Sequence, residues 1–121
     1  MHKRLLIVDD ERDLTDALAV SLTADGDFEV SIAYDGLDGL RMAEMVKPDL
    51  ILLDITMPVV DGWEMCRRLR DDPAMRRIPV VVLTAGSGKD LPQRAAEEGV
   101  SKVLLKPVGG DELLAVLRAC A

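Results

Sequence analysis

Aromatic side chains are scarce in this chain of 121 residues: they make up 2% of it, and Phe28, Tyr34 and Trp63 are the only rings. Proteins that bind single-stranded nucleic acid usually stack its bases on such rings, so the scarcity disfavours that class of function. The hydrophobic fraction is nevertheless 49%. Leu, Val, Ile, Ala and Met must therefore fill the core.

Basic residues are also in the minority, with 15 Lys and Arg against 22 Asp and Glu and a net charge of -7. Because affinity for a phosphate backbone comes mainly from Lys and Arg, direct nucleic-acid binding is not expected. No apolar run approaches the roughly 20 residues that span a bilayer, and the N-terminal MHKRLLIVDD turns acidic where a signal peptide would stay apolar. Two cysteines, Cys66 and Cys120, are too few for a disulfide framework or a zinc site. We therefore expect a cytoplasmic protein without membrane contact.

The length of the chain suits one domain, 1–121. Short apolar runs suited to β-strands recur along it. The runs are RLLIV (4–8), FEVSIA (28–33), DLILL (49–53), PVVVL (79–83) and KVLL (102–105). Segments of helical period follow them, with apolar positions at Leu14, Leu18 and Leu22; Leu37, Leu40 and Met45; Trp63, Cys66 and Leu69; a weaker stretch at 90–98; and Leu113, Val116, Leu117 and Cys120. This alternation predicts an α/β fold with a parallel sheet between two layers of helices, because parallel strands need crossover connections.

Polar residues stand at the ends of four predicted strands. Asp9 and Asp10 follow the first strand, Asp54 the third and Lys106 the fifth, while Thr84 ends the fourth. Ligands of an open parallel sheet bind outside the carboxyl ends of its strands, so these side chains are expected to share one rim. Two like charges about 4 Å apart repel by about 4 kcal/mol at an effective dielectric near 20. Since Mg²⁺ would offset that repulsion, the rim predicts a magnesium site beside a phosphoryl site.

One carboxylate of this rim is a candidate nucleophile that would form an aspartyl phosphate once a cation neutralises the cluster. Asp54 is that candidate because it is the single carboxylate after a central strand, whereas Asp9 and Asp10 form a pair suited to holding metal. The Lys106 ammonium and the Thr84 hydroxyl would stabilise charge on the transferred phosphoryl oxygens.

Four motifs occur together in the chain: VDDE (8–11), LLDITMPVVDG (52–62), VLTA (82–85) and LLKP (104–107). In this combination the sequence resembles the receiver domain of two-component response regulators over essentially its whole length. The resemblance implies a flavodoxin-like, doubly wound (βα)5 fold, whose five parallel strands have the order 2-1-3-4-5 with helices on both faces. It also implies that residues 1–121 form a single receiver domain.

The same resemblance implies a phosphorylation-dependent signalling switch. Asp54 would accept phosphate from a phosphohistidine of a sensor histidine kinase or a phosphotransfer protein. Asp10, Asp54 and the backbone carbonyl of Thr56 would ligate Mg²⁺ (or Mn²⁺), and Asp9 would hold a metal-bound water. Such a domain is not a turnover enzyme: it catalyses its own phosphorylation and a slow dephosphorylation, whose rate is expected to depend on Thr56 and Gly86.

The resemblance further implies how the signal leaves the site. Lys106 would pair with the phosphoryl group, and Thr84 would move toward it with the segment that starts at Ala85 and Gly86. The peptide bond between Lys106 and Pro107 would be cis. The fourth helix, fifth strand and fifth helix would face a downstream protein partner or an effector domain, and we expect a monomer.

Val103 departs from the family pattern, because most receivers carry Tyr or Phe three residues before the lysine. Val108 stands where Phe often follows the Lys-Pro pair. Neither departure affects the residues expected at the phosphorylation site. They remove the aromatic ring to which the threonine is usually coupled.

Two other functions compete with this interpretation. A receiver-like scaffold that binds a partner independently of phosphorylation is favoured by Val103. A small phosphatase of the haloacid dehalogenase type would also use an Asp nucleophile with Mg²⁺, Thr and Lys. That family, however, places its nucleophile after the first strand in an Asp-x-Asp pattern, whereas this chain has adjacent Asp9 and Asp10.

Two further patterns have ordinary explanations. The segment GSGKD (86–90) resembles a nucleotide-binding P-loop but lacks the first Gly and the Ser or Thr after the Lys, so it is expected to be a mobile loop beside the switch. Arg67, Arg68 and Arg70 are expected to form a solvated helix face.

Overall fold

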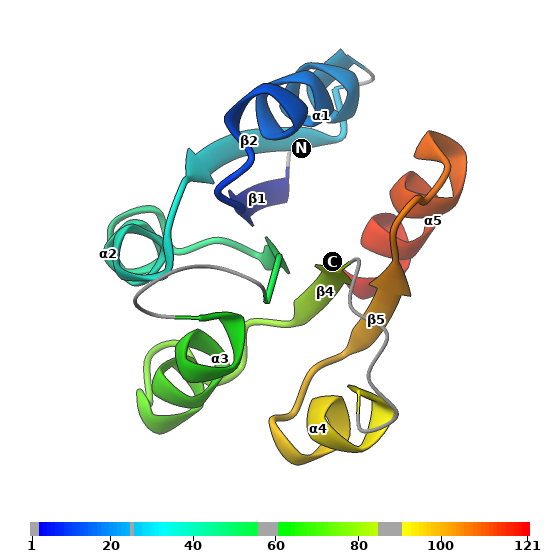
Figure 1. The fold of residues 1–121 in the computed structure, drawn as a ribbon. Helices are drawn as coiled ribbons and strands as arrows, with labels where there is room; N and C mark the ends of the chain where they lie inside the picture. Colours follow the sequence, from blue (N-terminus) through cyan, green and yellow to red (C-terminus); the bar gives the residue numbers. More distant parts are fainter. Residues whose placement is uncertain (1–2, 25, 56–60, 85–90) are drawn as a thin grey trace.

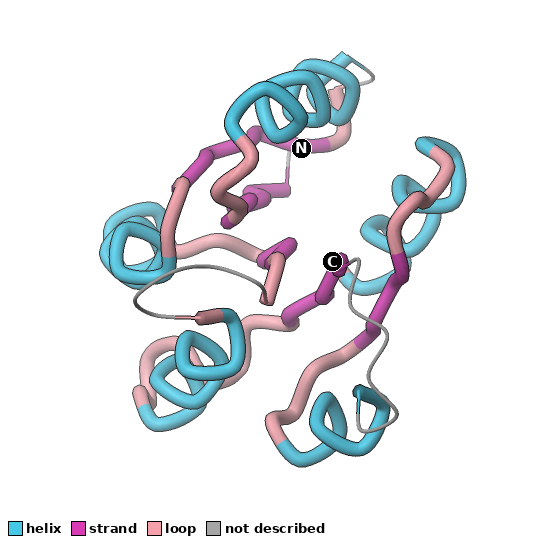
Figure 2. Tube along the Cα trace, in the orientation of Figure 1, coloured by secondary structure: helices cyan, strands magenta, loops and turns pink. Residues whose placement is uncertain are grey.

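The protein is described by a computed structural model that covers residues 3–24, 26–55, 61–84 and 91–121. Strands and helices alternate throughout these residues (Figures 1 and 2). The elements are β1 (Lys3–Val8), α1 (Arg12–Ala24), β2 (Phe28–Ala33), α2 (Gly36–Val46), β3 (Leu50–Leu53), α3 (Gly62–Asp71), β4 (Val80–Thr84), α4 (Leu91–Glu97), β5 (Lys102–Leu105) and α5 (Gly110–Cys120).

The sheet confirms the predicted topology. Its strands have the order β2-β1-β3-β4-β5, and every neighbouring pair is parallel. Helices α1 and α5 cover one face of the sheet, and α2, α3 and α4 cover the other (Figure 1). All four residues of β3 and all five of β4 are buried, which explains why these strands show no alternation of polar and apolar residues.

The core consists of two layers, one on each side of the sheet. In β1, Leu5 and Ile7 pack in the layer that contains Leu113 of α5, and Leu6 and Val8 pack in the other layer. Successive side chains of a strand point to opposite faces, so a single apolar run supplies both layers. The carboxyl ends of the central strands are thereby held in place from both sides.

Helix α2 buries small residues where larger ones were expected. The prediction of an apolar face formed by large side chains is wrong for Leu37 and Met45, which are 48% and 73% exposed. The buried residues of α2 are Gly36, Gly39 and Ala43. A Cβ at Gly39 would lie 3.0 Å from side-chain atoms of Val8 in β1 and Met65 in α3, so the helix packs closely against both at this position.

Helix α3 carries the signals that place its ends. Asp61 caps its first turn, because the Asp61 side chain accepts a hydrogen bond of 2.9 Å from the backbone N–H of Glu64. Cys66 is buried on its inner face, and burial, reinforced by the nearby Glu98 carboxylate, raises the pKa of the Cys66 thiol to about 12.

No helix in the described part of the chain has the length and apolar character needed to cross a membrane.

Candidate functional site

Backbone hydrogen bonds place the predicted site residues along one edge of the sheet. The N–H of Asp9 donates to the carbonyl of Ala33, and the N–H of Asp54 donates to the carbonyl of Val8. The N–H of Lys106 donates to the carbonyl of Thr84, which is the last residue of β4. The pairing of the strands therefore fixes the position of each of these residues at the carboxyl ends of the strands, as the sequence pattern predicts.

The Lys106 ammonium lies among three carboxylates. Its Nζ is 3.4 Å from Asp9 Oδ2, 3.8 Å from Asp54 Oδ2 and 3.5 Å from Glu11 Oε1. The Asp54 and Asp9 side chains are 6% and 11% exposed, whereas that of Glu11 is 58% exposed. Two buried negative charges and one positive charge thus share a small volume at this edge.

Two opposing effects act on the pKa of Lys106, namely burial and the charges of the neighbouring carboxylates. Burial by itself lowers the pKa of the Lys106 ammonium, but the negative charges of Asp9, Asp54 and Glu11 outweigh it and raise the pKa above its ordinary value. Lys106 is therefore held in its charged form. It offsets part of the repulsion among the carboxylates, and it presents a positive charge beside Asp54.

Glu11 also belongs to this cluster, as a residue that precedes the following helix. Helix α1 begins one residue later, at Arg12, and the Glu11 N–H donates to Asp9 Oδ1 at 3.0 Å. One carboxylate oxygen each from Asp9, Glu11 and Asp54 lies within 4.8 Å of the others. The i, i+2 spacing of Asp9 and Glu11 was the available sequence signal, because alternate residues of an extended segment share a side.

Asp10 is exposed and is not part of that group of three carboxylates. Its assignment as a direct metal ligand stays a prediction. The backbone carbonyl of Thr56, a further predicted ligand, and the switch residues Ala85 and Gly86 lie outside the described residues. The same holds for the whole of the GSGKD segment, 86–90.

The remaining switch positions lie where the motifs indicate. Thr84 is fully buried at the carboxyl end of β4. The peptide bond between Lys106 and Pro107 is cis, as the resemblance implies. Val103 is half-buried, pairs in register with Val82 of β4, and packs against the core layer under α3.

The donor set fits a hard divalent cation. Asp9, Glu11 and Asp54 offer only carboxylate oxygens, which Mg²⁺ and Mn²⁺ prefer over nitrogen or sulfur ligands. The cluster also carries more negative charge than Lys106 neutralises. Both the chemistry of the ligands and the excess charge favour a bound cation at this edge.

An apolar cavity opens beside the cluster. Its volume is about 440 Å³, and it lies between α1 and α5 with Asp9 and Lys106 at its border. Its apolar lining comes from Leu14, Leu18, Leu83, Pro107, Val108 and Leu113. Leu14 is 51% exposed, so part of this lining faces solvent.

Comparison with known proteins gives a consistent result. The family model of the response regulator receiver domain matches residues 5–118. The chain is 44% identical over 119 residues to the response regulator PleD of Caulobacter vibrioides, which covers 98% of this chain and 26% of PleD. It is 40% identical over 117 residues to the DNA-binding dual master transcriptional regulator RpaA of a Synechocystis species, covering 96% of this chain and 48% of RpaA. The chain thus spans about a quarter to a half of these relatives.

Solved structures agree with the sequence comparison. The chemotaxis response regulator CheY4 of Vibrio cholerae superimposes with a TM-score of 0.91 at 27% identity, covering all of both chains. A putative response regulator from Chloroflexus aurantiacus gives a TM-score of 0.91 at 29% identity, covering 99% of this chain and 98% of that one. Motifs, strand order, site geometry and these similarities lead to one conclusion: the chain belongs to the family of response regulator receiver domains.

Proposed function

We propose that this receiver domain is a signalling switch in which Asp54 takes up a phosphoryl group from a phosphohistidine. The observation that carries the proposal is the position of the Lys106 ammonium, 3.8 Å from Asp54 Oδ2 at the carboxyl edge of the sheet. The Asp54 carboxylate would form a bond to phosphorus as the bond from phosphorus to the histidine nitrogen breaks. The donor imidazole leaves with that electron pair, and an aspartyl phosphate results.

The residues around Asp54 supply what phosphoryl transfer requires, which is chiefly positioning and charge stabilisation. Asp10, Asp54 and the Thr56 carbonyl are the proposed ligands of Mg²⁺, and Asp9 would hold a metal-bound water. The geometry adds Glu11 to the carboxylates of this edge. When bound, the cation would neutralise carboxylate charge and phosphoryl oxygen charge. Lys106 is held charged and close enough to turn from its carboxylates to a phosphoryl oxygen.

The apolar cavity between α1 and α5 supports a protein as phosphodonor. A donor histidine must be brought to Asp54, and the half-exposed Leu14 with Pro107 and Val108 forms an apolar surface directly beside Lys106. We propose a sensor histidine kinase or a phosphotransfer protein at this surface, in the cytoplasm. The output would pass through α4, β5 and α5 to a downstream protein partner or effector domain.

A scaffold that binds its partner independently of phosphorylation is the second candidate. Val103 favours it, because a half-buried valine that already packs against the core has little surface to expose or withdraw. The complete acidic cluster with Lys106 favours the switch. Partner binding that is equal with and without a phosphoryl mimic would decide for the scaffold.

Labelling by a small phosphodonor tests the proposed switch. In acetyl phosphate and Mg²⁺ the protein is expected to gain the mass of one phosphoryl group, and the gain should disappear when EDTA removes the cation. Receiver domains are generally not turnover enzymes, so the phosphoryl group should stay on the protein and be lost only slowly after the donor is removed. Intact-protein mass spectrometry reads both results. Labelling that is equally fast in EDTA would contradict the role of the cation.

A further inference from the structure

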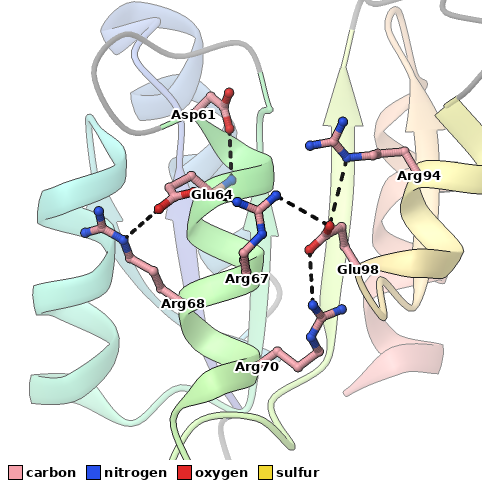
Figure 3. Close-up of polar contacts among 7 residues, drawn as sticks. All are labelled: Asp61, Glu64, Arg67, Arg68, Arg70, Arg94 and Glu98. Atoms are coloured by element: carbon pink, nitrogen blue, oxygen red, sulfur yellow. Dashed lines mark hydrogen bonds and ion pairs between the residues drawn. The ribbon is translucent and has the colours of Figure 1, made fainter.

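A nearly buried carboxylate joins α3 to α4 on the side of the sheet opposite α1 and α5. The Glu98 side chain is 9% exposed and lies among three guanidinium groups (Figure 3). Glu98 Oε1 is 3.8 Å from Arg67 and 3.9 Å from Arg94, and Oε2 is 3.7 Å from Arg70. We call Arg67, Arg70, Arg94 and Glu98 the Glu98 network. Two of the three arginines predicted to form a solvated face, Arg67 and Arg70, thus contact Glu98 at the end of α4, whereas Arg68 pairs with Glu64 of its own helix.

The position of Glu98 at the end of α4 makes its arginine partners necessary. Val100 N–H donates to the Ala95 carbonyl and Gly99 N–H to the Ala96 carbonyl, with Gly99 at a φ of 71°, which is the hydrogen-bond pattern of a Schellman C-cap. Glu98 is the capping residue of that motif. A negative charge is unfavourable at a helix C-terminus, because the last carbonyls already carry partial negative charge.

Arg70 offsets this cost from the neighbouring helix. Its Nη1 donates a hydrogen bond of 2.6 Å to the Glu97 carbonyl, one of the last carbonyls of α4, while its Nη2 faces Glu98. Helix α4 has only 7 residues, and isolated helices shorter than about 12–15 residues are marginal in water. Its stability therefore depends on contacts such as these with α3.

The Glu98 contact is loose enough to respond to a shift of α4. Direct hydrogen bonds between a guanidinium and a carboxylate are about 2.7–2.9 Å long, whereas the shortest Glu98 contact is 3.7 Å. Oε2 is shielded from solvent and accepts no hydrogen bond from the described part of the chain. Because a shielded oxygen without a hydrogen bond is costly, movement of α4 toward or away from α3 changes the energy of this contact.

Helix α3 is in turn fixed to the phosphoacceptor strand. Gly62, its first residue, is buried, and its N–H donates to the carbonyl of Ile55, the residue after Asp54. A Cβ at Gly62 would lie 2.4 Å from Ile55 Cα and 2.9 Å from the Asp54 carbonyl oxygen. The backbone at Asp54 and Ile55 thus contacts the start of α3 directly, so a displacement of Asp54 would reach that helix.

We propose that Glu98 is a positioning residue that ties the C-terminal end of α4 to α3, so that α4 responds to Asp54 through α3. The inference rests on the proposed function, because it assigns a second route to the output face. This route does not require an aromatic ring at Val103. Arg94 strengthens the tie at its other end, since its guanidinium lies 5.5 Å from the centre of the Trp63 ring at the start of α3.

Hydrogen exchange of the backbone amides of residues 93–98, which cover α4 after Pro92 together with its capping residue Glu98, tests this contact. It is measured in the free protein and with Mg²⁺ and beryllofluoride, a phosphoryl mimic. Glu98→Gln keeps the shape and removes the charge. We expect it to speed exchange of these amides roughly fivefold in the free protein, the scale of a partly exposed ion pair. We also expect it to remove at least half of the change that beryllofluoride causes there in the unaltered protein.

Two comparison variants make the result specific. Glu97→Gln is the matched control: it is the adjacent acid, it is exposed, and its side chain contacts Gln93 rather than the network, so exchange should stay within twofold of the unaltered protein. Arg70→Gln removes the same contact from its exposed partner and should reproduce Glu98→Gln. A residue that merely stabilises α4 would change the exchange in the free protein and leave the response to beryllofluoride intact.

The outcomes separate this inference from the function on which it rests. If the unaltered protein shows no labelling and no binding of beryllofluoride, the proposed function fails. The comparison of α4 exchange between the free unaltered protein and free Glu98→Gln still tests whether Glu98 holds α4 to α3. If beryllofluoride binds and the α4 response is the same in Glu98→Gln as in the unaltered protein, the inference is overturned. An unaltered protein whose α4 exchange ignores beryllofluoride would overturn it as well.

Discussion

Replacement of Asp54 by Asn is expected to reduce phosphoryl labelling by at least about a hundredfold, to background. The amide has the same shape as the carboxylate but no anionic oxygen to attack phosphorus. It also removes one of the three carboxylates that lie within 4.8 Å of one another. Labelling with acetyl phosphate in Mg²⁺, followed by intact-protein mass spectrometry, measures the loss.

A matched aspartate shows that the loss is specific. Asp71 is exposed at the last position of α3, whereas Gly62 at the first position is the one that contacts Ile55. Asp71→Asn therefore makes the same chemical change at the opposite end of that helix. This variant should label like the unaltered protein. Undiminished labelling of the Asp54→Asn variant would mean that another residue is the acceptor.

The second large effect is on stability and arises at Gly62. Replacement by Ala would place a Cβ 2.4 Å from Ile55 Cα and 2.6 Å from Ile55 Cγ2. The close atoms belong to the backbone as well as to a side chain, so the chain at Asp54 and Ile55 or the start of α3 must move. We expect Gly62→Ala to lower the free energy of unfolding by about 3 kcal/mol, the upper range for overpacking a core, as measured by urea unfolding.

Gly110 provides the control for this prediction. It is the first residue of α5, and a Cβ there would have no neighbour within 4 Å. Gly110→Ala should leave the free energy of unfolding unchanged or raise it by up to about 1 kcal/mol, because Ala favours the helix. Equal stability of the two variants would show that the contact between Gly62 and Ile55 is not tight in solution.

The sequence predicted the sheet and the rim because these depend on local patterns. The continuous runs of β3 and β4 are buried on both faces, and strand ends in a parallel sheet fall on one edge, so Asp9, Asp54 and Lys106 met as expected. The strand order and the cis bond before Pro107 came from the resemblance to the family. Neither follows from periodicity.

Other features depended on distances that a pattern does not contain. Large apolar residues suggested the inner face of α2, but the helix packs closely against Val8 and Met65 at Gly39, and its buried residues are small. The sequence gives no signal for the contacts of Glu98, because an acid near the end of a helix is usually solvated. Its pairing with Arg70 joins residues on two different helices and exists only in the folded chain.

The identity of the phosphorylated residue tests the central claim most directly. After labelling in Mg²⁺, reduction with borohydride converts an aspartyl phosphate to homoserine, and peptide mass spectrometry locates the change in the sequence. We expect homoserine at position 54 and at no other aspartate position, including 9 and 10. An unchanged Asp54 beside a labelled residue elsewhere would contradict it.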